Sequence, residues 1–365
     1  MRFLFGICAW GLGHATRTLP IIRKAVNEGH RVTVVSSGRA LNLLQRELGE
    51  SVLFIGLEDY NPPETLNPSF LVPATLLRFP EYLRSMFREK DFVKRFIMNR
   101  NIDVIFSDNR FAFYSREVPS YFMGHQLRIL NPLGNIALEN GSEIYNDYFL
   151  KRYAGILVPD FAEDGLAGRL AHDLSRIEKK RISYTGALSE FNYQAIPQDL
   201  DLFVSISGPE PHRTSFEHVV RKQLEGFKGK VVVTLGKPGE NAQEESNVRS
   251  YLGRKERENL LNRSKIVIAR SGYSTLMDLF SLRKRGLLIP TPGQLEQEYL
   301  ANYHMQRKTF YCVSERELDI PNQLDKALAY YPPAPKYSSE KAAEMAFDII
   351  TQTVKLEQPQ MMSVR

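Results

Sequence analysis

Residues 265–302, KIVIARSGYSTLMDLFSLRKRGLLIPTPGQLEQEYLAN, decide the predicted fold. The run Ile266–Ala269 is short, apolar and rich in β-branched residues, which is typical of a buried parallel strand. After the turn Arg270–Gly272 the apolar spacing becomes helical. The apolar stripe of this helix consists of Leu276, Leu279, Phe280 and Leu282, and its candidate N-caps are Ser271, Ser274 and Thr275. The strand therefore leads to a helix N-terminus, whose unpaired N–H groups and positive dipole end suit a phosphate.

A second strand is predicted over Gly286–Pro290, and the next helix begins near Gln294. Its first turn carries amide and carboxylate side chains, among them Gln297 and Glu298. Such groups at the carboxyl end of a strand suit the many hydroxyls of a sugar. Asp278 lies one turn inside the preceding helix, where its carboxylate is placed to accept hydrogen bonds from a ribose diol.

The order and spacing of these residues resemble a known motif. Arg-Ser-Gly-Tyr-Ser-Thr-Leu-Met-Asp (270–278), Pro-Thr-Pro-Gly (290–293), Gln-Glu-Tyr (297–299) and Asn302 look like the nucleotide-sugar motif of the MurG-like peptidoglycan N-acetylglucosaminyltransferases, glycosyltransferase family 28. The resemblance implies the GT-B fold, in which two doubly wound Rossmann-like α/β domains face each other across a cleft and a C-terminal helix crosses back to the first domain. It also implies that the donor diphosphate is bound by Ser271, Gly272, Ser274 and Thr275. An ordinary βαβ unit with solvated Gln and Glu is the alternative interpretation.

A second glycine-rich junction lies near the N-terminus. A strand over Phe3–Ala9 runs into the loop Gly11–Arg17, and a helix and another strand follow, so this region is a βαβ unit in a parallel sheet. The loop does not fit a dinucleotide site, because Thr16 stands where the third glycine of GxGxxG belongs, and no Walker A motif occurs. The family resemblance implies that Gly11 and Gly13 face the sugar donor. His14 at the loop apex is a candidate base, and a helix cap is its other interpretation.

Polar residues end two further predicted strands, with Asp108 closing residues 102–108 and His125 following residues 119–124. Open α/β sheets bind ligands at the carboxyl ends of their strands, so we expect both residues to cluster with His14. A bond from Asp108 to the imidazole would fix the tautomer and raise the basicity of His14. Structural roles for Asp108 and His125 remain open alternatives.

The length of 365 residues favours two domains. We expect an acceptor-side domain over 1–190, a nucleotide-sugar-binding domain over 198–335 and a helix over 338–356 that packs on the first domain. The candidate donor contacts at the start of the second domain are Ser207, Gly208 and Arg213, and those for the pyrimidine base are Tyr251 and Leu252.

Composition narrows the class of protein without defining its ligand. A net charge of +6 without an RRM, KH, zinc-finger or helix-turn-helix signature disfavours nucleic-acid binding. Cys8 and Cys312 lie in apolar runs, which indicates buried thiols in a reducing compartment. Without a secretory signal or a run long enough to span a bilayer, we expect a cytoplasmic protein.

Residues 70–100 interleave large apolar and basic side chains. They are interpreted either as a peripheral contact with the inner membrane face or, as we favour, as helices packed on the core with basic faces in water.

These patterns together predict an inverting glycosyltransferase that uses a UDP-sugar, a hexose or N-acetylhexosamine, without a metal or cofactor. No Asp-x-Asp motif is placed at a strand end, so we expect helix N-termini and Arg270 or Arg213 to stabilise the leaving diphosphate. The expected acceptor is a hydroxyl of unknown identity, such as that of a lipid-linked or cell-envelope glycan precursor. A nucleotide-sugar hydrolase or epimerase, or a non-catalytic nucleotide-sugar binder, are the alternatives.

Overall fold

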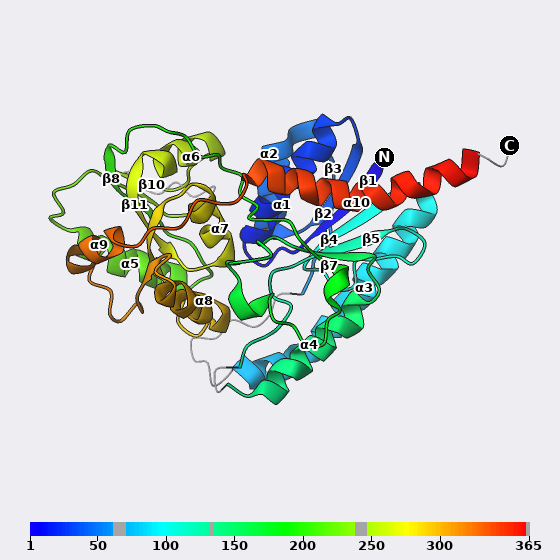
Figure 1. Cartoon of the computed structure of the whole chain (residues 1–365), viewed down its shortest axis with the longest axis horizontal. Helices are drawn as coiled ribbons and strands as arrows, with labels where there is room; N and C mark the ends of the chain where they lie inside the picture. The colour runs from blue at the N-terminus through cyan, green and yellow to red at the C-terminus, as the bar shows by residue number, and fades with distance from the viewer. Residues whose placement is uncertain (61–70, 132–133, 238–246, 363–365) are drawn as a thin grey trace. The chain divides into compact units, whose positions relative to one another are not determined.

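The computed structural model describes residues 1–60, 71–131, 134–237 and 247–362, with the side chains of 71–76 and 353–362 left undescribed. The chain divides into two compact units. The first comprises Met1–Pro63, Ser69–Leu188 and Ser339–Arg365, and the second is built on Ser189–Ser338. Each unit is an α/β domain with its own sheet (Figure 1).

The first unit has a seven-stranded sheet in the order β3-β2-β1-β4-β5-β6-β7. Its strands are β1 (Arg2–Ile7), β2 (Arg31–Ser36), β3 (Leu53–Gly56), β4 (Val104–Asp108), β5 (Ser120–Met123), β6 (Gly155–Val158) and β7 (Ile182–Tyr184). Every pairing in the sheet is parallel. The strand order reverses between β1 and β4, which makes their carboxyl ends the switch point where such sheets bind ligands.

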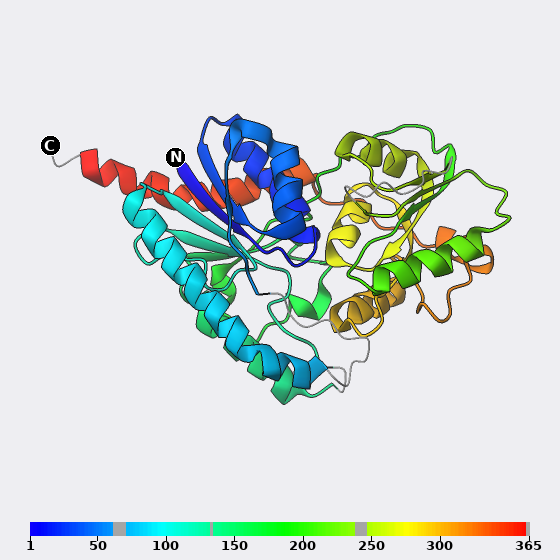
Figure 2. The same cartoon turned by 180° about the vertical axis from the view of Figure 1, so that it is seen from behind.

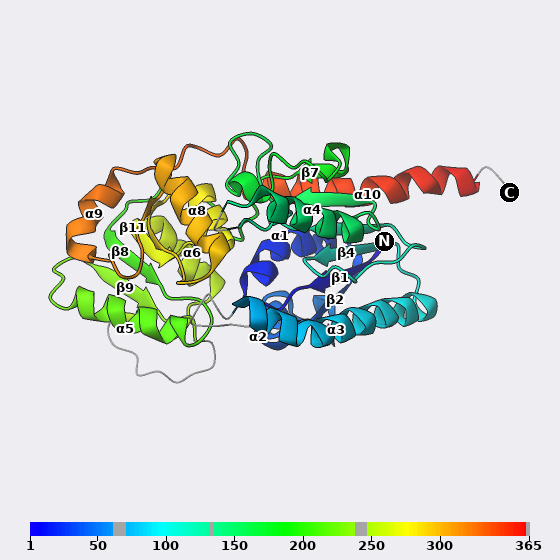
Figure 3. The ribbon, with the colours of Figure 1, turned by 90° about the horizontal axis from the view of Figure 1, so that it is seen from below.

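Helices cover both faces of this sheet. They are α1 (Gly13–Asn27), α2 (Gly38–Leu48), α3 (Leu71–Asn99), α4 (Ile136–Leu150) and α10 (Ser339–Met362), with short 3-10 turns at Gly49–Ser51, Gly168–Leu170 and Lys179–Arg181. Side chains alternate along β1, because successive residues of a strand point to opposite faces. The Phe3 ring lies 5.7 Å from that of Phe347 on α10, whereas Leu4 packs in a cluster with Val93 of α3. Figure 3 shows the strands between these two helices.

The second unit has a six-stranded sheet in the order β10-β9-β8-β11-β12-β13. Its strands are β8 (Leu200–Ser205), β9 (Val231–Thr234), β10 (Val248–Arg249), β11 (Ser264–Arg270), β12 (Arg285–Ile289) and β13 (Tyr311–Cys312), and its helices are α5 (His212–Leu224), α6 (Arg254–Arg263), α7 (Tyr273–Ser281), α8 (Leu295–Gln306) and α9 (Ile320–Leu328). All its pairings are parallel, and the order reverses between β8 and β11. Figure 2 shows this sheet from behind.

The predicted strand and helix pattern of residues 265–302 is confirmed by β11, α7, β12 and α8. Ile268 of β11 is fully buried in a core cluster with Phe216 of α5 and Ile320 of α9, which is why the apolar run forms a central strand. The predicted side-chain caps are wrong. The N-cap of α7 is Gly272 and no side chain caps this helix. The Ser271 hydroxyl donates instead to the Gln297 carbonyl at 3.0 Å.

Two doubly wound parallel sheets confirm the predicted α/β fold class. The C-terminal helix α10 packs against α1 and β4 of the first unit. The basic and apolar segment predicted over 70–100 forms a single helix, α3, while residues 61–70 before it lie outside the described residues. In the part of the chain that the structure covers, no helix has the length and apolar content needed to cross a bilayer.

Candidate functional site

The first candidate site lies at the switch point of the first unit. Ile7 of β1 is level with Asp108 of β4 in the sheet. Beyond Ile7 the chain turns through Gly11, whose φ of +79° favours glycine, and Gly13 begins helix α1. His14 is the second helical residue, and its Nδ1 lies 2.8 Å from Asp108 Oδ1. The loop therefore brings the two residues predicted as base and partner into contact.

Asp108 is completely buried and surrounded by donors. Arg17 donates to both carboxylate oxygens, with Nε 2.8 Å from Oδ2, and the Thr18 hydroxyl donates to Oδ2 at 2.7 Å. Burial by itself raises the pKa of Asp108, but the positive charge of Arg17 and the contact with His14 hold this pKa well below its usual range. Asp108 is thus a carboxylate across the physiological pH range.

Burial and the charge of Arg17 lower the pKa of His14, while the Asp108 carboxylate opposes them. His14 is therefore a neutral imidazole at neutral pH, the form that can accept a proton. His125 joins the cluster through Arg17, whose Nη1 lies 2.8 Å from His125 Nδ1. Arg17 and Thr18 were not predicted as site residues. The signal for Arg17 was its position three residues after His14, which places both on one helix face.

The second candidate site lies at the switch point of the second unit. Ser205, the last residue of β8, is level with Ala269 of β11. Ser207 and Gly208 follow β8 and are partly exposed, and Gly208 has a φ of +116°. Gly272 follows β11 and begins α7, whose first turn contains Ser274 and Thr275, both partly exposed. The residues predicted to hold a diphosphate therefore follow neighbouring strands at one sheet edge, and their role stays a prediction.

Asp278 lies on α7 and is partly buried. Ser189 Oγ donates to its Oδ1 at 2.6 Å. Burial raises the pKa of Asp278 to about 6, against the opposing effects of Ser189 and Arg257. Arg257 of α6 also donates from Nη2 to Ser205 Oγ at 3.1 Å. No helical or strand register in the sequence links Ser189 and Arg257 to Asp278, so neither residue was predicted as a neighbour of Asp278.

Gln297 and Glu298 both hold the turn before α8. Gln297 Oε1 accepts from the Thr291 N–H at 2.9 Å, and Glu298 Oε1 accepts from the Gly293 N–H at 2.9 Å. Each carboxylate or amide thus has an internal partner, and contact with sugar hydroxyls stays a prediction for both residues.

Arg213 and Arg270, predicted to stabilise the leaving diphosphate, are buried with internal partners. Arg213 donates to Glu210 and to the Leu235 carbonyl. The guanidinium of Arg270 lies 2.7 Å from Glu315 and 4.0 Å from the centre of the Phe216 ring. These contacts stabilise the second unit without a ligand. The candidate base contacts, Tyr251 and Leu252, lie between β10 and α6, and Leu252 is buried.

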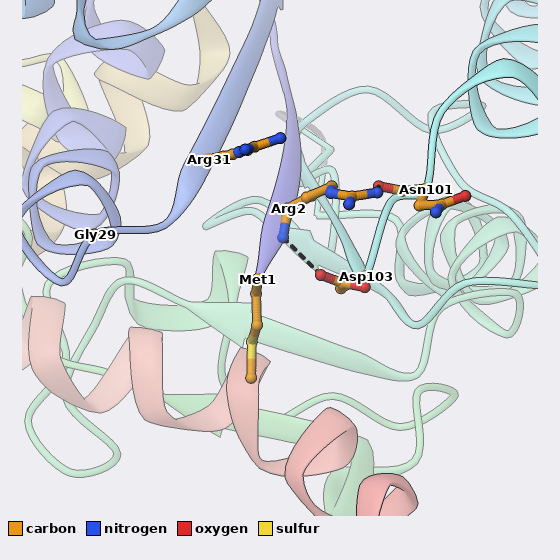
Figure 4. Close-up of a pocket in the computed structure, with 6 residues that line it drawn as sticks. All are labelled: Met1, Arg2, Gly29, Arg31, Asn101 and Asp103. Atoms are coloured by element: carbon orange, nitrogen blue, oxygen red, sulfur yellow. Dashed lines mark hydrogen bonds between the residues drawn. The ribbon is translucent and has the colours of Figure 1, made fainter. Parts of the chain in front are cut away.

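An open pocket of the first unit lies away from these residues. Its lining consists of Met1, Arg2, Gly29, Arg31, Asn101 and Asp103 (Figure 4). The Arg2 N–H donates to Asp103 Oδ2 at 2.7 Å inside it. The pocket is at the amino ends of β1 and β2, whereas His14 and Asp108 lie at the carboxyl end of the sheet, so we do not assign it to the candidate site.

Both cysteines are buried free thiols, as the sequence predicted. Burial raises both thiol pKa values, that of Cys312 to about 12, so neither is a nucleophilic thiolate at neutral pH. Among the described residues, no group of three or more His, Cys, Asp and Glu side chains is arranged to hold a metal ion.

Comparisons with known proteins define the class of this fold. Residues 216–355 match the glycosyltransferase family 28 C-terminal domain, and residues 1–110 match glycosyl transferase family 1. With two parallel-sheet α/β units, the chain has the GT-B type of fold found in glycosyltransferases.

Individual relatives are distant. An uncharacterized glycosyltransferase of Methanosarcina mazei is 27% identical over 210 residues, which are 53% of each chain, so this chain spans about half the length of the curated relatives it matches. The calicheamicin glycosyltransferase CalG4 aligns with a TM-score of 0.60 at 13% identity, covering 100% of this chain and 99% of its own. MurG of Acinetobacter baumannii aligns with a TM-score of 0.56 at 11% identity, covering 96% and 100%. At these identities the structural likeness establishes the fold alone, and it does not single out the MurG-like group.

Proposed function

We propose that the protein is an inverting glycosyltransferase that transfers a hexose or N-acetylhexosamine from a UDP-sugar to an acceptor hydroxyl without a metal. The observation that carries this proposal is the contact of His14 with the buried Asp108 carboxylate at the switch point of the first sheet. A neutral imidazole oriented by a carboxylate is suited to take a proton from a hydroxyl. The matches of both chain halves to glycosyltransferase families support the same reaction class.

The proposed reaction is a single displacement. The acceptor oxygen attacks the anomeric carbon, the bond from that carbon to the diphosphate breaks, and UDP leaves with the bonding electrons. His14 Nε2 takes the hydroxyl proton, and Asp108 stabilises the resulting imidazolium. Attack from the side opposite the leaving group inverts the anomeric centre.

The donor half of the reaction is assigned to the second unit. The N-terminus of α7 has no side-chain cap, so its first N–H groups and its dipole are suited to the leaving diphosphate. Asp278 is proposed to hold the ribose, and Gln297 with Glu298 the sugar hydroxyls. Because Arg213, Arg270 and the Ser271 hydroxyl have internal partners, we assign the diphosphate mainly to backbone N–H groups and to the hydroxyls of Ser274 and Thr275.

We further propose that the acceptor is lipid-linked, for instance a cell-envelope glycan precursor, and that α3 and α4 rest on the inner membrane face. The burial pattern of helix α4 is the reverse of that of an ordinary surface helix. The helix buries polar residues, of which Glu143 pairs with Arg128 at 2.6 Å and Glu139 with Arg169 at 2.5 Å. Its exposed residues are apolar or aromatic and include Ile136, Leu138, Ile144, Tyr145 and Tyr148.

Helix α3 continues this apolar surface. The hydroxyls of Tyr82 on α3 and Tyr145 on α4 lie 2.6 Å apart. Leu77 and Phe87 of α3 are 83% and 69% exposed. The exposed basic residues of α3 include Arg84, Arg88, Lys90, Lys94 and Arg95. Exposed apolar side chains beside basic ones fit an anionic lipid surface.

The test is a thermal-shift panel of UDP-, GDP- and dTDP-sugars, followed by turnover assays with and without acceptor alcohols. A donor that binds only the folded protein raises its melting temperature. We expect UDP-sugars to give the largest shift, and His14→Ala to keep this shift while losing transfer. Sugar release or isomerisation without acceptor would favour a hydrolase or epimerase, and binding with no turnover would favour a non-catalytic binder. Full transfer activity in His14→Ala would refute the assigned base.

A further inference from the structure

Arg17 contacts all three of the other ionisable groups at the first candidate site. It is 3% exposed and lies on α1, one turn after His14. Its guanidinium donates to both oxygens of Asp108, and its Nη1 and Nη2 lie 2.8 Å from His125 Nδ1 and 2.9 Å from His14 Nδ1. We propose that Arg17 is a positioning residue that gives the two histidines opposite tautomers, with the proton of His14 on Nδ1 and that of His125 on Nε2.

The tautomer of His125 follows from the chemistry of arginine. A guanidinium carries five N–H donors, has no acceptor and does not lose its proton in proteins. His125 Nδ1, at 2.8 Å from Nη1, must therefore be the acceptor of that contact. An acceptor nitrogen has no proton, so the ring hydrogen of His125 is on Nε2.

His14 has the opposite arrangement because its Nδ1 faces an acceptor. The Asp108 carboxylate has only lone pairs to offer, so the 2.8 Å contact requires the proton on His14 Nδ1. Arg17 Nη2 donates to the same Oδ1. The 2.9 Å between Nη2 and His14 Nδ1 is then the separation of two donors that share one oxygen. His14 Nε2 is left with a free lone pair.

The charges around His14 explain why it stays neutral. The groups that face it are Arg17 on its own helix, Asp108 at the end of β4 and His125 after β5. Arg17 and Asp108 form a buried pair that is neutral in sum, so a proton on His14 adds a net positive charge to the site. Burial and Arg17 accordingly lower the pKa of His14. His14 thus presents a base to the acceptor hydroxyl, a role that rests on the proposed function.

Histidine ¹⁵N NMR of the whole protein tests the tautomers without a substrate. The chain has seven histidines, and His14→Gln and His125→Gln assign the two resonance sets by their disappearance. We expect a protonated Nδ1 for His14 and a protonated Nε2 for His125 at pH 7.5. The reverse tautomer at either residue in the unmutated protein would overturn the proposal.

Two variants separate the charge of Arg17 from its geometry. Arg17→Gln removes the charge, so the pKa of His14 should rise by about one pH unit or more, and the acidic limb of log kcat/KM should move to higher pH by the same amount. Arg17→Lys keeps the positive charge but loses the planar set of N–H donors of the guanidinium. The His14 pKa should therefore stay near its original value, while His125 becomes a mixture of tautomers. An unchanged His14 pKa in a folded Arg17→Gln protein would refute the role. If Arg17→Gln does not fold, the tautomers of the unmutated protein and of Arg17→Lys still decide.

The failure of this inference is distinguishable from failure of the proposed function. The predicted tautomers without sugar transfer from any donor would leave Arg17 as assigned and refute the transferase. Sugar transfer that depends on His14, together with the wrong tautomers, would refute only the role of Arg17.

Discussion

Ser189 Oγ donates a hydrogen bond to Asp278 Oδ1 at 2.6 Å, although the two residues are 89 positions apart in the chain. The Ser189 hydroxyl also accepts from the Phe191 N–H at 3.1 Å, which fixes the start of the second unit beside helix α7. Asp278 therefore combines burial with a defined orientation. A carboxylate placed in this way is costly to ionise, because burial disfavours its charged form.

The first prediction concerns the stability of Asp278→Asn as a function of pH. The folded pKa of Asp278 is about 6, above the ordinary value of 3.8, so between these pH values the folded protein keeps a proton that the unfolded chain has lost. This contribution favours folding below about pH 4 and is lost as the pH rises through 6. Asp278→Asn should therefore match the unmutated protein at pH 4 and exceed its stability at pH 8 by roughly 3 kcal/mol. Differential scanning calorimetry at both pH values checks this.

Asp201→Asn is the control, and its effect on stability at pH 8 should be opposite to that of Asp278→Asn. A hydrogen bond from Lys265 lowers the pKa of Asp201, so its contribution is present at neutral pH and is lost as the pH falls. We expect Asp201→Asn to lower stability at pH 8.

UDP-sugar affinity should fall about tenfold in Asp278→Asn and stay unchanged in Asp201→Asn. Equal donor affinity in all three proteins would remove Asp278 from the donor site.

The second prediction separates the base from its partner. His14→Ala should leave stability within about 1 kcal/mol, because its imidazole is partly exposed, and should reduce kcat by roughly 100- to 10,000-fold. Asp108→Asn should also reduce kcat, and it should cost about 3 kcal/mol of stability because it leaves the buried Arg17 charge unpaired. Urea unfolding and initial rates of both variants and of the double variant form a double-mutant cycle. Rate losses that simply add would mean that the two residues act independently.

A third prediction tests the burial pattern of helix α4, in which polar side chains are buried and apolar ones are exposed. Glu143 is fully buried and accepts from Arg128 Nε and from the N–H groups of Ser175 and Arg176 at 2.6–2.8 Å. Glu143→Ala should therefore destabilise the protein by about 3 kcal/mol or more. Ile144→Ala, at the next position and 56% exposed, should change stability by less than about 0.5 kcal/mol. Chemical denaturation measures both, and a larger loss for Ile144→Ala would show that its side chain is buried in solution.

A fourth prediction concerns lipid. The double variant Leu138→Ser/Ile144→Ser removes two exposed apolar side chains of α4, so its affinity for vesicles containing phosphatidylglycerol should fall at least about tenfold in sedimentation assays. Leu328→Ser, at an exposed apolar position of the second unit, is the matched control and should bind as the unmutated protein does. Vesicles of phosphatidylcholine alone should bind weakly, since the basic residues of α3 then meet no net charge. Equal binding of the double variant and the control would exclude this face as the lipid contact.

The sequence predicted the strands that end at the two candidate sites, among them β1, β4 and β11. Continuous apolar runs such as Ile266–Ala269 are readable because a strand buried on both faces needs apolar residues throughout. The edge strand β10 was not predicted. Val248–Arg249 forms β10 with only two residues, so no periodicity exists to detect it.

Only some residues of the two candidate sites could be predicted from the sequence. His14 and Asp108 were predicted as a pair because both follow parallel strands, and the carboxyl ends of parallel strands share one edge. Arg17 and Ser189 were not predicted, because their roles depend on side-chain direction and on contacts between distant segments. The assignment of Arg270 and Arg213 to a diphosphate also illustrates this limit, since only packing revealed Glu315 and Glu210 as their partners.

The sequence by itself determined the alternation of strands and helices, the parallel sheets and the edge at which polar residues gather, because apolar periodicity and glycine positions act locally along the chain. Only the tertiary structure decided which ionisable side chains lie in contact with one another. Burial and distances of about 3 Å set the pKa values of Asp108, His14 and Asp278, and both depend on segments that are up to 94 residues apart.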